Sequence, residues 1–173
     1  MLQYASGILL LVMMVGWAIW LSDQRKSLIE YVLEQANAKP ILPSCQWVPI
    51  YAPDLATLGF SRTGKSWWTN QTLAVLAFRT NERPPLFVDL GIVKVVGKSV
   101  AISGDGGAAR PLAGELVHDE IIRLPLQTRT RTDAHAVVIT VAHPRPPHGV
   151  DQRWLGVAIN SIRVCDAGDL ARQ

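Results

Sequence analysis

The hydrophobic positions of the chain fall into two regions with different patterns. From Leu2 to Leu21 apolar residues follow one another almost without interruption, and the first charged side chain is that of Asp23. After Pro43, short runs rich in valine, isoleucine, threonine and aromatic residues alternate with glycine, proline and aspartate. The first pattern indicates a long apolar helix, and the second indicates β-strands separated by turns.

The opening run has the length of a membrane-spanning helix. At about 1.5 Å per residue, residues 2–21 would extend roughly 30 Å, the thickness of bilayer hydrocarbon. Trp17 and Trp20 lie near its end, where aromatic side chains meet lipid headgroups. We therefore predict an uncleaved transmembrane anchor over residues 1–21, with the lipid bilayer as its partner. The alternative is a cleaved signal peptide, which would begin with a basic segment that is missing here.

Residues 22–38 have the pattern of a second, short helix. Its apolar residues are spaced so that they form one stripe, made of Leu28, Ile29, Val32, Leu33 and Ala36. Pro40 and Pro43 end the helical pattern. We expect residues 22–43 to form an amphipathic helix and a linker, with the stripe in contact with a partner protein or with the membrane surface.

The remainder of the chain predicts an all-β domain. Seven strands are expected, near residues 45–51, 72–79, 86–96, 98–103, 117–124, 134–142 and 156–165. This spacing is typical of an antiparallel, jelly-roll-like β-sandwich, which we place at 44–165, followed by a tail at 166–173. In the last strand the apolar residues change face between Ile159 and Ile162, which predicts a β-bulge near Asn160 and Ser161.

The two cysteines bear on the compartment. Cys45 lies in the first expected strand and Cys165 in the last, so the two thiols can form a disulfide if these strands pair. Such a bond requires an oxidising compartment, whereas two unrelated buried thiols do not. The basic residues Arg25 and Lys26 favour instead a cytoplasmic β domain. On the cysteines we expect a single-pass inner-membrane protein whose β domain is periplasmic.

Charge and motifs exclude several classes of function. There are 17 Lys+Arg against 14 Asp+Glu, and the basic residues are scattered, so we expect no nucleic-acid partner. The segment from Gly59 to Ser66, with Lys65, matches the G-x-x-x-x-G-K-[ST] phosphate-binding loop. No hydrophobic strand precedes it and no βαβ pattern surrounds it, so we expect a surface loop and no nucleotide. The histidines lack zinc-ligand spacing and no nucleophile elbow occurs, so we expect no metal, no cofactor and no enzyme activity.

Adjacent tryptophans offer a different chemistry. On a strand Trp67 and Trp68 would point to opposite faces, so that one ring fills the core and the other is exposed. An exposed ring can stack against the C–H face of a sugar, because its own face is apolar and electron-rich. Trp154 is a second candidate platform. Core packing is the alternative for each of these rings.

Residues 59–78 and 143–164 contain two motifs, and with these motifs the chain resembles a β-sandwich domain that is appended to bacterial membrane glycosyltransferases and related surface-polysaccharide proteins. Gly59-Phe60-Ser61, Trp68-Thr69-Asn70 and the run from Ala74 to Phe78 are similar to its opening, "GWS … GRWT … A-x-L-x-F". His143 to Pro147 and Asp151 to Val164 are similar to its ending, "P-x-x-P … D-x-R-x-L-G-[IV]-[AG]-[IL]-x-x-[IL]-[RK]-[IVL]". The resemblance implies an accessory domain without catalysis, in cell-surface glycan assembly.

Together these observations predict a non-catalytic, membrane-anchored accessory or glycan-binding module in bacterial cell-surface polysaccharide assembly or modification. Its partners would be a glycan and a membrane glycosyltransferase or polymer-assembly protein. The candidate carbohydrate-binding residues are Trp67, Trp68, Asp151, Arg153 and Trp154. The alternative is a structural subunit that docks a membrane partner through its helices and binds no ligand.

Overall fold

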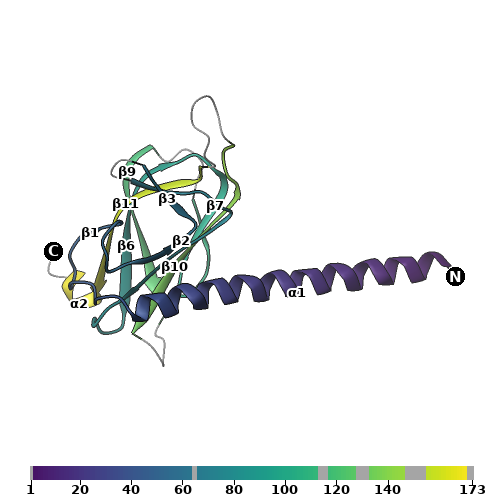
Figure 1. The fold of residues 1–173 in the computed structure, drawn as a ribbon, viewed down its shortest axis with the longest axis horizontal. Helices are drawn as coiled ribbons and strands as arrows, with labels where there is room; N and C mark the ends of the chain where they lie inside the picture. The colour runs from purple at the N-terminus through teal and green to yellow at the C-terminus, as the bar shows by residue number, and fades with distance from the viewer. Residues whose placement is uncertain (1, 64–65, 113–116, 128–132, 147–154, 171–173) are drawn as a thin grey trace. The chain divides into compact units, whose positions relative to one another are not determined.

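The chain forms two compact units. The computed structural model describes residues 2–63, 66–112, 117–127, 133–146 and 155–170 (Figure 1). The first unit, Met1–Tyr31, consists of most of a helix, α1 (Leu2–Asn37). The second unit, Val32–Gln173, contains the end of that helix, all of the strands and a short helix, α2 (Ala167–Leu170).

One continuous helix takes the place of the two that the sequence predicts before Pro40. The reason is that residues 17–38 contain no glycine or proline, so nothing interrupts α1 where the charged residues begin. Within the described residues, no helix is long and apolar enough to cross a membrane. The transmembrane anchor expected at 1–21 is therefore not borne out by this part of the chain.

The C-terminal part of the apolar stripe is covered by the chain itself. Val32, Leu33 and Ala36 are all buried, and they belong to the second unit. Leu28, at the start of the stripe, is exposed. The expectation that the whole stripe docks a partner or a membrane is therefore wrong for its second half, which packs inside the second unit.

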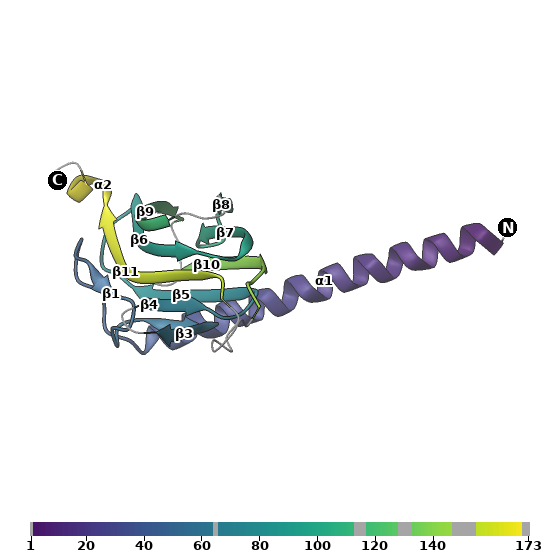
Figure 2. The same ribbon diagram turned by 90° about the horizontal axis from the view of Figure 1, so that it is seen from above.

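The strands form two antiparallel sheets (Figures 1 and 2). The six-stranded sheet has the order β3-β4-β11-β6-β9, with β1 also paired to β11. Its strands are β1 (Val48–Pro49), β3 (Phe60–Thr63), β4 (Ser66–Thr69), β6 (Leu86–Val95), β9 (Val117–Leu126) and β11 (Val157–Asp166). The five-stranded sheet has the order β2-β5-β10-β7-β8. Its strands are β2 (Ala56–Leu58), β5 (Leu73–Arg79), β7 (Lys98–Gly104), β8 (Arg110–Leu112) and β10 (Ala134–His143).

The predicted antiparallel sandwich is confirmed. Most consecutive strands cross from one sheet to the other, as in a jelly roll, so that strands distant in sequence become neighbours. Alternate residues of each strand face the gap between the sheets, and they are mostly aliphatic. The largest fully buried side chains of this core include Phe78, Ile50, Leu76, Leu90, Ile92, Ile102 and Ile122. The seven strands expected from the sequence are present, and the short strands β2, β3, β4 and β8 are additional.

A disulfide joins the start of the sandwich to its last strand. Cys45 and Cys165 are bonded, with their Cα atoms 4.5 Å apart. The backbone N–H of Cys45 also donates a hydrogen bond to the carbonyl oxygen of Val164, at 3.0 Å. The bond closes a loop with a sequence separation of 120, so on loop entropy it stabilises the fold by about 5 kcal/mol.

Candidate ligand-binding site

The outer face of the six-stranded sheet is built around its strand β6. On this strand Gly91 pairs with Ser161 of β11 on one side and with Ile121 of β9 on the other. Leu90 of β6, next to Gly91, and Ile122 of β9, next to Ile121, are both buried in the core. Because neighbouring residues on a strand point to opposite faces, Ser161, Gly91 and Ile121 form a row on the outside of the sandwich.

A β-bulge adds a polar side chain to this row. The pairing of β11 with β6 shifts between Ile159 and Ser161, which confirms the bulge expected from the sequence. Ile159 and Ile162 both remain fully buried, so the extra residue, Asn160, is accommodated without moving the core. The Ser161 hydroxyl donates a hydrogen bond of 2.8 Å to Asn160 Oδ1. Two polar side chains therefore lie side by side on the outer face.

A pocket of about 370 Å³ opens over this row. It is lined by Trp47, Gly91, Ile121, Asn160 and Ser161. The Trp47 side chain is 40% exposed and that of Ile121 is 55% exposed, although both are large and apolar. The volume lies within the range of small-molecule sites, and such sites combine an apolar surface with a few polar groups in the same way.

Gly91 forms the floor of the pocket. A Cβ atom at this position would collide with Asn160 Oδ1 and with Ser161 Oγ. The absence of a side chain therefore allows both polar groups to lie over the backbone of β6. It also leaves a depression between taller neighbours, which are Trp47 on one side and Ile121 on the other.

A row of charged residues runs beside the pocket. Asp89 lies two residues from Gly91 on β6, and it pairs with Arg163 of β11 and with Arg123 of β9. Arg123 binds the carboxylate through two hydrogen bonds, from Nε to Oδ1 at 2.7 Å and from Nη2 to Oδ2 at 2.9 Å. Arg163 Nη2 donates a further bond of 2.7 Å to Oδ2. One buried carboxylate is thus shared by two guanidinium groups.

The two guanidinium groups set the protonation of Asp89. Burial of this carboxyl raises its pKa, but the hydrogen bonds and positive charges of Arg123 and Arg163 together outweigh burial and hold the pKa below its ordinary value. The same hydrogen bond to Asp89 raises the pKa of Arg123. Both shifts favour the charged forms of Asp89 and Arg123, and the row holds two guanidinium groups against one carboxylate.

The aromatic wall of the pocket is fixed by this charged row. The guanidinium carbon of Arg163 lies over the Trp47 ring, 4.8 Å from its centroid. This is the geometry of a cation–π contact. Since Arg163 is in turn held by Asp89, the indole has a rigid support on one face of the ring. Its remaining surface contributes to the pocket.

The chemistry of the pocket is suited to binding rather than to catalysis. Its lining residues offer an aromatic ring, an aliphatic surface, an amide and a hydroxyl, and none of the five is an acid or a base. The Ser161 hydroxyl donates to an amide oxygen, so this bond does not activate it as a nucleophile. Rings and uncharged hydrogen-bonding groups in this combination can hold a polyhydroxylated molecule.

Trp67 and Trp68, the two sequence candidates that the structure describes, do not line this pocket. Trp67 packs against the core, and Trp68 lies on the opposite face of β4, half-buried and opposite Ala158 of β11. Asp151, Arg153 and Trp154 lie outside the described residues. Sequence reasoning missed the platform at Trp47 and the row at Gly91 and Ile121. Its single pointer to the pocket was the expected bulge at Asn160 and Ser161.

The phosphate-loop match has the surroundings of a hairpin. Phe60–Thr63 forms β3 and Ser66–Thr69 forms β4, and the two strands pair antiparallel. Gly64 and Lys65 lie outside the described residues. A phosphate-binding loop requires a helix N-terminus directly after the glycine-rich turn, and here a strand follows instead. The described part of the segment therefore lacks the strand–loop–helix arrangement of that motif.

A buried histidine–carboxylate pair lies in the other sheet. His135 Nδ1 and Asp105 Oδ2 are 2.6 Å apart, and the other carboxylate oxygen accepts a hydrogen bond of 2.8 Å from the Ala136 N–H. Both side chains are buried, and the His135 ring stacks on Phe78 of the core. Because no substrate can reach these groups as they stand, the pair is part of the packing of β10 against the turn after β7.

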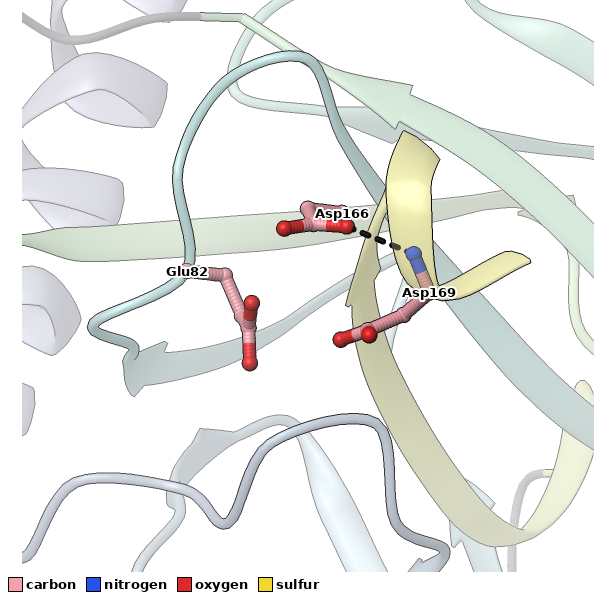
Figure 3. Close-up of side chains that lie close together, drawn as sticks. All are labelled: Glu82, Asp166 and Asp169. Atoms are coloured by element: carbon pink, nitrogen blue, oxygen red, sulfur yellow. Dashed lines mark hydrogen bonds between the residues drawn. The ribbon is translucent and has the colours of Figure 1, made fainter. Parts of the chain in front are cut away.

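Three carboxylates cluster near α2 (Figure 3). One oxygen each from Glu82, Asp166 and Asp169 lie within 4.8 Å of one another. The Asp169 N–H donates a hydrogen bond of 2.7 Å to Asp166 Oδ1, and the Ser44 hydroxyl donates a long one of 3.4 Å to Asp169 Oδ2. Carboxylate oxygens are the ligands that calcium prefers, so these are the residues of the described chain that could hold a hard cation. The sequence did not indicate this group, because Glu82 is far along the chain from Asp166 and Asp169.

Comparison with known proteins gives a distant likeness in fold. No family model matches the chain, and no curated protein matches it. One similar structure is a family two carbohydrate esterase from Cellvibrio japonicus, at 10% identity and TM-score 0.39, covering 69% of this chain and 32% of that one. A second is the carbohydrate-binding module CBM6cm-2 from Cellvibrio mixtus lichenase 5A in complex with cellotriose. Its identity is 14% and its TM-score 0.41, and the match covers 70% of this chain and 97% of that one. A third is CBM35 from Paenibacillus barcinonensis, at 9% identity and TM-score 0.42, covering 69% of this chain and 97% of that one. The chain thus spans about a third of the esterase and nearly all of each module.

Proposed function

We propose that the protein is a non-catalytic glycan-binding protein and that the pocket over Gly91 holds a sugar. The observation that supports this most directly is the exposed Trp47 ring beside the Asn160 amide and the Ser161 hydroxyl. Sugars present an apolar C–H face and hydroxyl groups at the rim. The pocket offers a complementary surface for each of these parts.

The rigidity of the Trp47 platform favours binding. The ring has few rotamers to lose, and Arg163 already holds it in place through the contact at 4.8 Å. Binding then costs little side-chain entropy, which is the main benefit of a preorganised site. One ring and two small polar groups still make a modest contact, so we expect weak binding, with Kd on the order of 0.1–1 mM.

The test is a binding measurement with the full chain. Wild-type protein is screened against an oligosaccharide panel, and the best ligand is titrated calorimetrically against Trp47→Ala. We expect this variant to bind at least about tenfold more weakly, because the stacking surface is lost. Trp20→Ala is the matched control, since Trp20 is also exposed but lies in the first unit. It should bind as the wild type does.

Two results would overturn the proposal. One is the absence of binding by any oligosaccharide of the panel. The other is equal affinity of wild-type protein and Trp47→Ala for the same ligand. Thermal denaturation of both variants shows whether each is folded, so that a loss of binding is not confused with a loss of structure.

We propose further that the β domain lies outside the cytoplasm. The support is the disulfide between Cys45 and Cys165, since such bonds persist in oxidising compartments and are rare in the cytosol. Alkylation of intact cells with and without prior reduction tests this. We expect both thiols to be blocked until a reductant is added. Labelling of both cysteines without reductant would contradict it.

The proposed role of the bound glycan is in cell-surface polysaccharide assembly or modification. This part rests on the resemblance of the closing segment, from Asp151 to Val164, to the ending of the surface-polysaccharide domains. Asn160 and Ser161 of the pocket, and Arg163 beneath Trp47, fall within that segment. Deletion of the gene is expected to change the amount or chain length of the surface polysaccharide. An unchanged polysaccharide would contradict the role but leave glycan binding intact.

A further inference from the structure

The outer face that carries the pocket has an excess of positive charge. The row beside the pocket holds two arginines, Arg123 and Arg163, against one carboxylate, Asp89. On the other side of the pocket, Lys94 of β6 pairs with Ala158 of β11 and is exposed. Among the residues that the register pairs on this face of β6, β9 and β11 and whose side chains are described, three are cations and one is an anion.

These charges flank the pocket from both sides. The arginine row is two residues from Gly91 along β6, or about 7 Å, and Lys94 is three residues from Gly91, or about 10 Å. Both therefore lie within about one Debye length of a ligand over Gly91 at 0.1 M salt. The nearest cation, Arg163, is in direct contact with the Trp47 ring that lines the pocket.

Arg123 adds accessible hydrogen-bonding capacity. Its side chain is 46% exposed, although its Nε and Nη2 are bound to Asp89. Its Nη1 forms no hydrogen bond within the described part of the chain. A guanidinium edge of this kind suits carboxylate or sulfate oxygens better than uncharged hydroxyl groups.

We propose that the pocket selects sugars that bear an anionic group, so that acidic glycans bind in preference to neutral ones. This inference rests on the proposed glycan binding and names the class of ligand. The aromatic ring and the polar pair at Asn160 and Ser161 hold the sugar ring, and the surrounding cations favour its negative substituent. A ring carboxylate and an ester sulfate have this chemistry in common, and the experiment distinguishes between them.

The first experiment compares matched ligands on the full chain. Tetragalacturonate and its methyl ester differ chiefly in the charge of the ring carboxylates, and a sulfated galactan tetrasaccharide and its desulfated, neutral form make a second pair. We expect the charged member of at least one pair to bind about fivefold or more tightly at 20 mM salt. This preference should shrink at 0.5 M salt, since the cations act partly through solvent.

The second experiment changes the charge of the face without touching the lining. Lys94→Glu should weaken binding of the preferred acidic ligand about threefold to fivefold at low salt, as expected for reversing one charge at this distance. Lys98→Glu is the control, because Lys98 is also exposed but lies on β7 of the other sheet. It should leave the affinity unchanged.

The outcomes separate this inference from the proposed function. Equal binding of charged and uncharged members, or tighter binding of the uncharged ones, overturns the preference and leaves glycan binding standing. An equal effect of Lys94→Glu and Lys98→Glu also overturns it, because the charge would then act from anywhere on the surface. If neutral and acidic oligosaccharides alike fail to bind, the proposed function itself is wrong.

Discussion

Replacement of Asp89 by asparagine tests the charged row most sharply. The substitution keeps the size of the side chain and removes its charge. Asp89 is 2% exposed, and it accepts three charge-assisted hydrogen bonds from Arg123 and Arg163. Asparagine can accept fewer of them and balances neither cation.

The expected cost follows from the exposure of the two arginines. A hydrogen bond to a charged group contributes about 1.5–3 kcal/mol, and removing one partner of a buried pair costs about 3–5 kcal/mol. Arg123 is half-exposed and can turn to water, so the loss of its hydrogen bonds to Asp89 adds less to the free-energy cost. The Arg163 side chain is 14% exposed and cannot do so. We expect Asp89→Asn to lower the free energy of unfolding by about 2–4 kcal/mol, measured by urea denaturation at pH 7.

The dependence on pH gives a second, independent readout. The pKa of Asp89 in the folded chain lies below its ordinary value of 3.8, so its contribution to stability is complete above that value. As the pH falls further, the unfolded chain takes up the proton first and the contribution is lost. The difference in the free energy of unfolding between wild type and Asp89→Asn should therefore be constant from pH 7 to about pH 5 and should narrow below pH 4.

Asp133→Asn is the matched control. Asp133 is 68% exposed and lies 3.9 Å from Arg79, so this pair should contribute no more than about 0.5 kcal/mol. If Asp89→Asn cost no more than the control, the shared carboxylate would not stabilise the face. If the difference from wild type were the same at pH 3 as at pH 7, charge would not be its cause.

Three further predictions concern the pocket, the disulfide and one buried hydrogen bond. Gly91→Val should abolish glycan binding measured by calorimetry, because its side chain displaces the polar groups over the floor of the pocket. The double change Cys45→Ser and Cys165→Ser should lower the free energy of unfolding in urea by about 3–5 kcal/mol. Thr69→Val should cost about 1–3 kcal/mol in the same assay, because the buried Val157 N–H loses its acceptor, Thr69 Oγ1, at 2.8 Å.

Each of these has an outcome that would count against it. Retained affinity in Gly91→Val would show that the ligand lies elsewhere, and Gly16→Ala provides a control at a glycine with open space around it. A double serine variant as stable as the wild type under non-reducing conditions would contradict the loop-entropy argument. If Thr69→Ser, which keeps the hydroxyl, lost as much stability as Thr69→Val, the hydrogen bond would not be the cause.

The sandwich was largely predictable because its long strands alternate clearly. In β10, Val137, Ile139 and Val141 recur with a period of two and all belong to the core, and β11 shows the same period on either side of its bulge. The short strands β2, β3, β4 and β8 were missed because three or four residues are too few for a period to be visible. The helix was divided wrongly at residue 22, since a change in polarity does not interrupt backbone hydrogen bonds.

The site was much less predictable, because it depends on which strands become neighbours. Ser161, Gly91 and Ile121 are separated by dozens of residues and meet only through the pairing of β11, β6 and β9. Trp47 precedes a strand of only two residues, so no alternation of apolar and polar residues around it could predict that its side chain is exposed. The adjacent pair Trp67 and Trp68 was conspicuous in the sequence, yet Trp67 packs on the core and neither lines the pocket.

The sulfur–sulfur bond between Cys45 and Cys165 has a mechanical consequence. A pull applied between α1 and the C-terminal end of the chain enters at Cys45 and leaves at Cys165, since these residues bracket nearly all of the strands. The load is then carried by a covalent link, and the polypeptide between the two sulfurs bears no tension. The pocket residues from Trp47 to Ser161 all lie within this loop, so tension between the two chain ends bypasses the pocket.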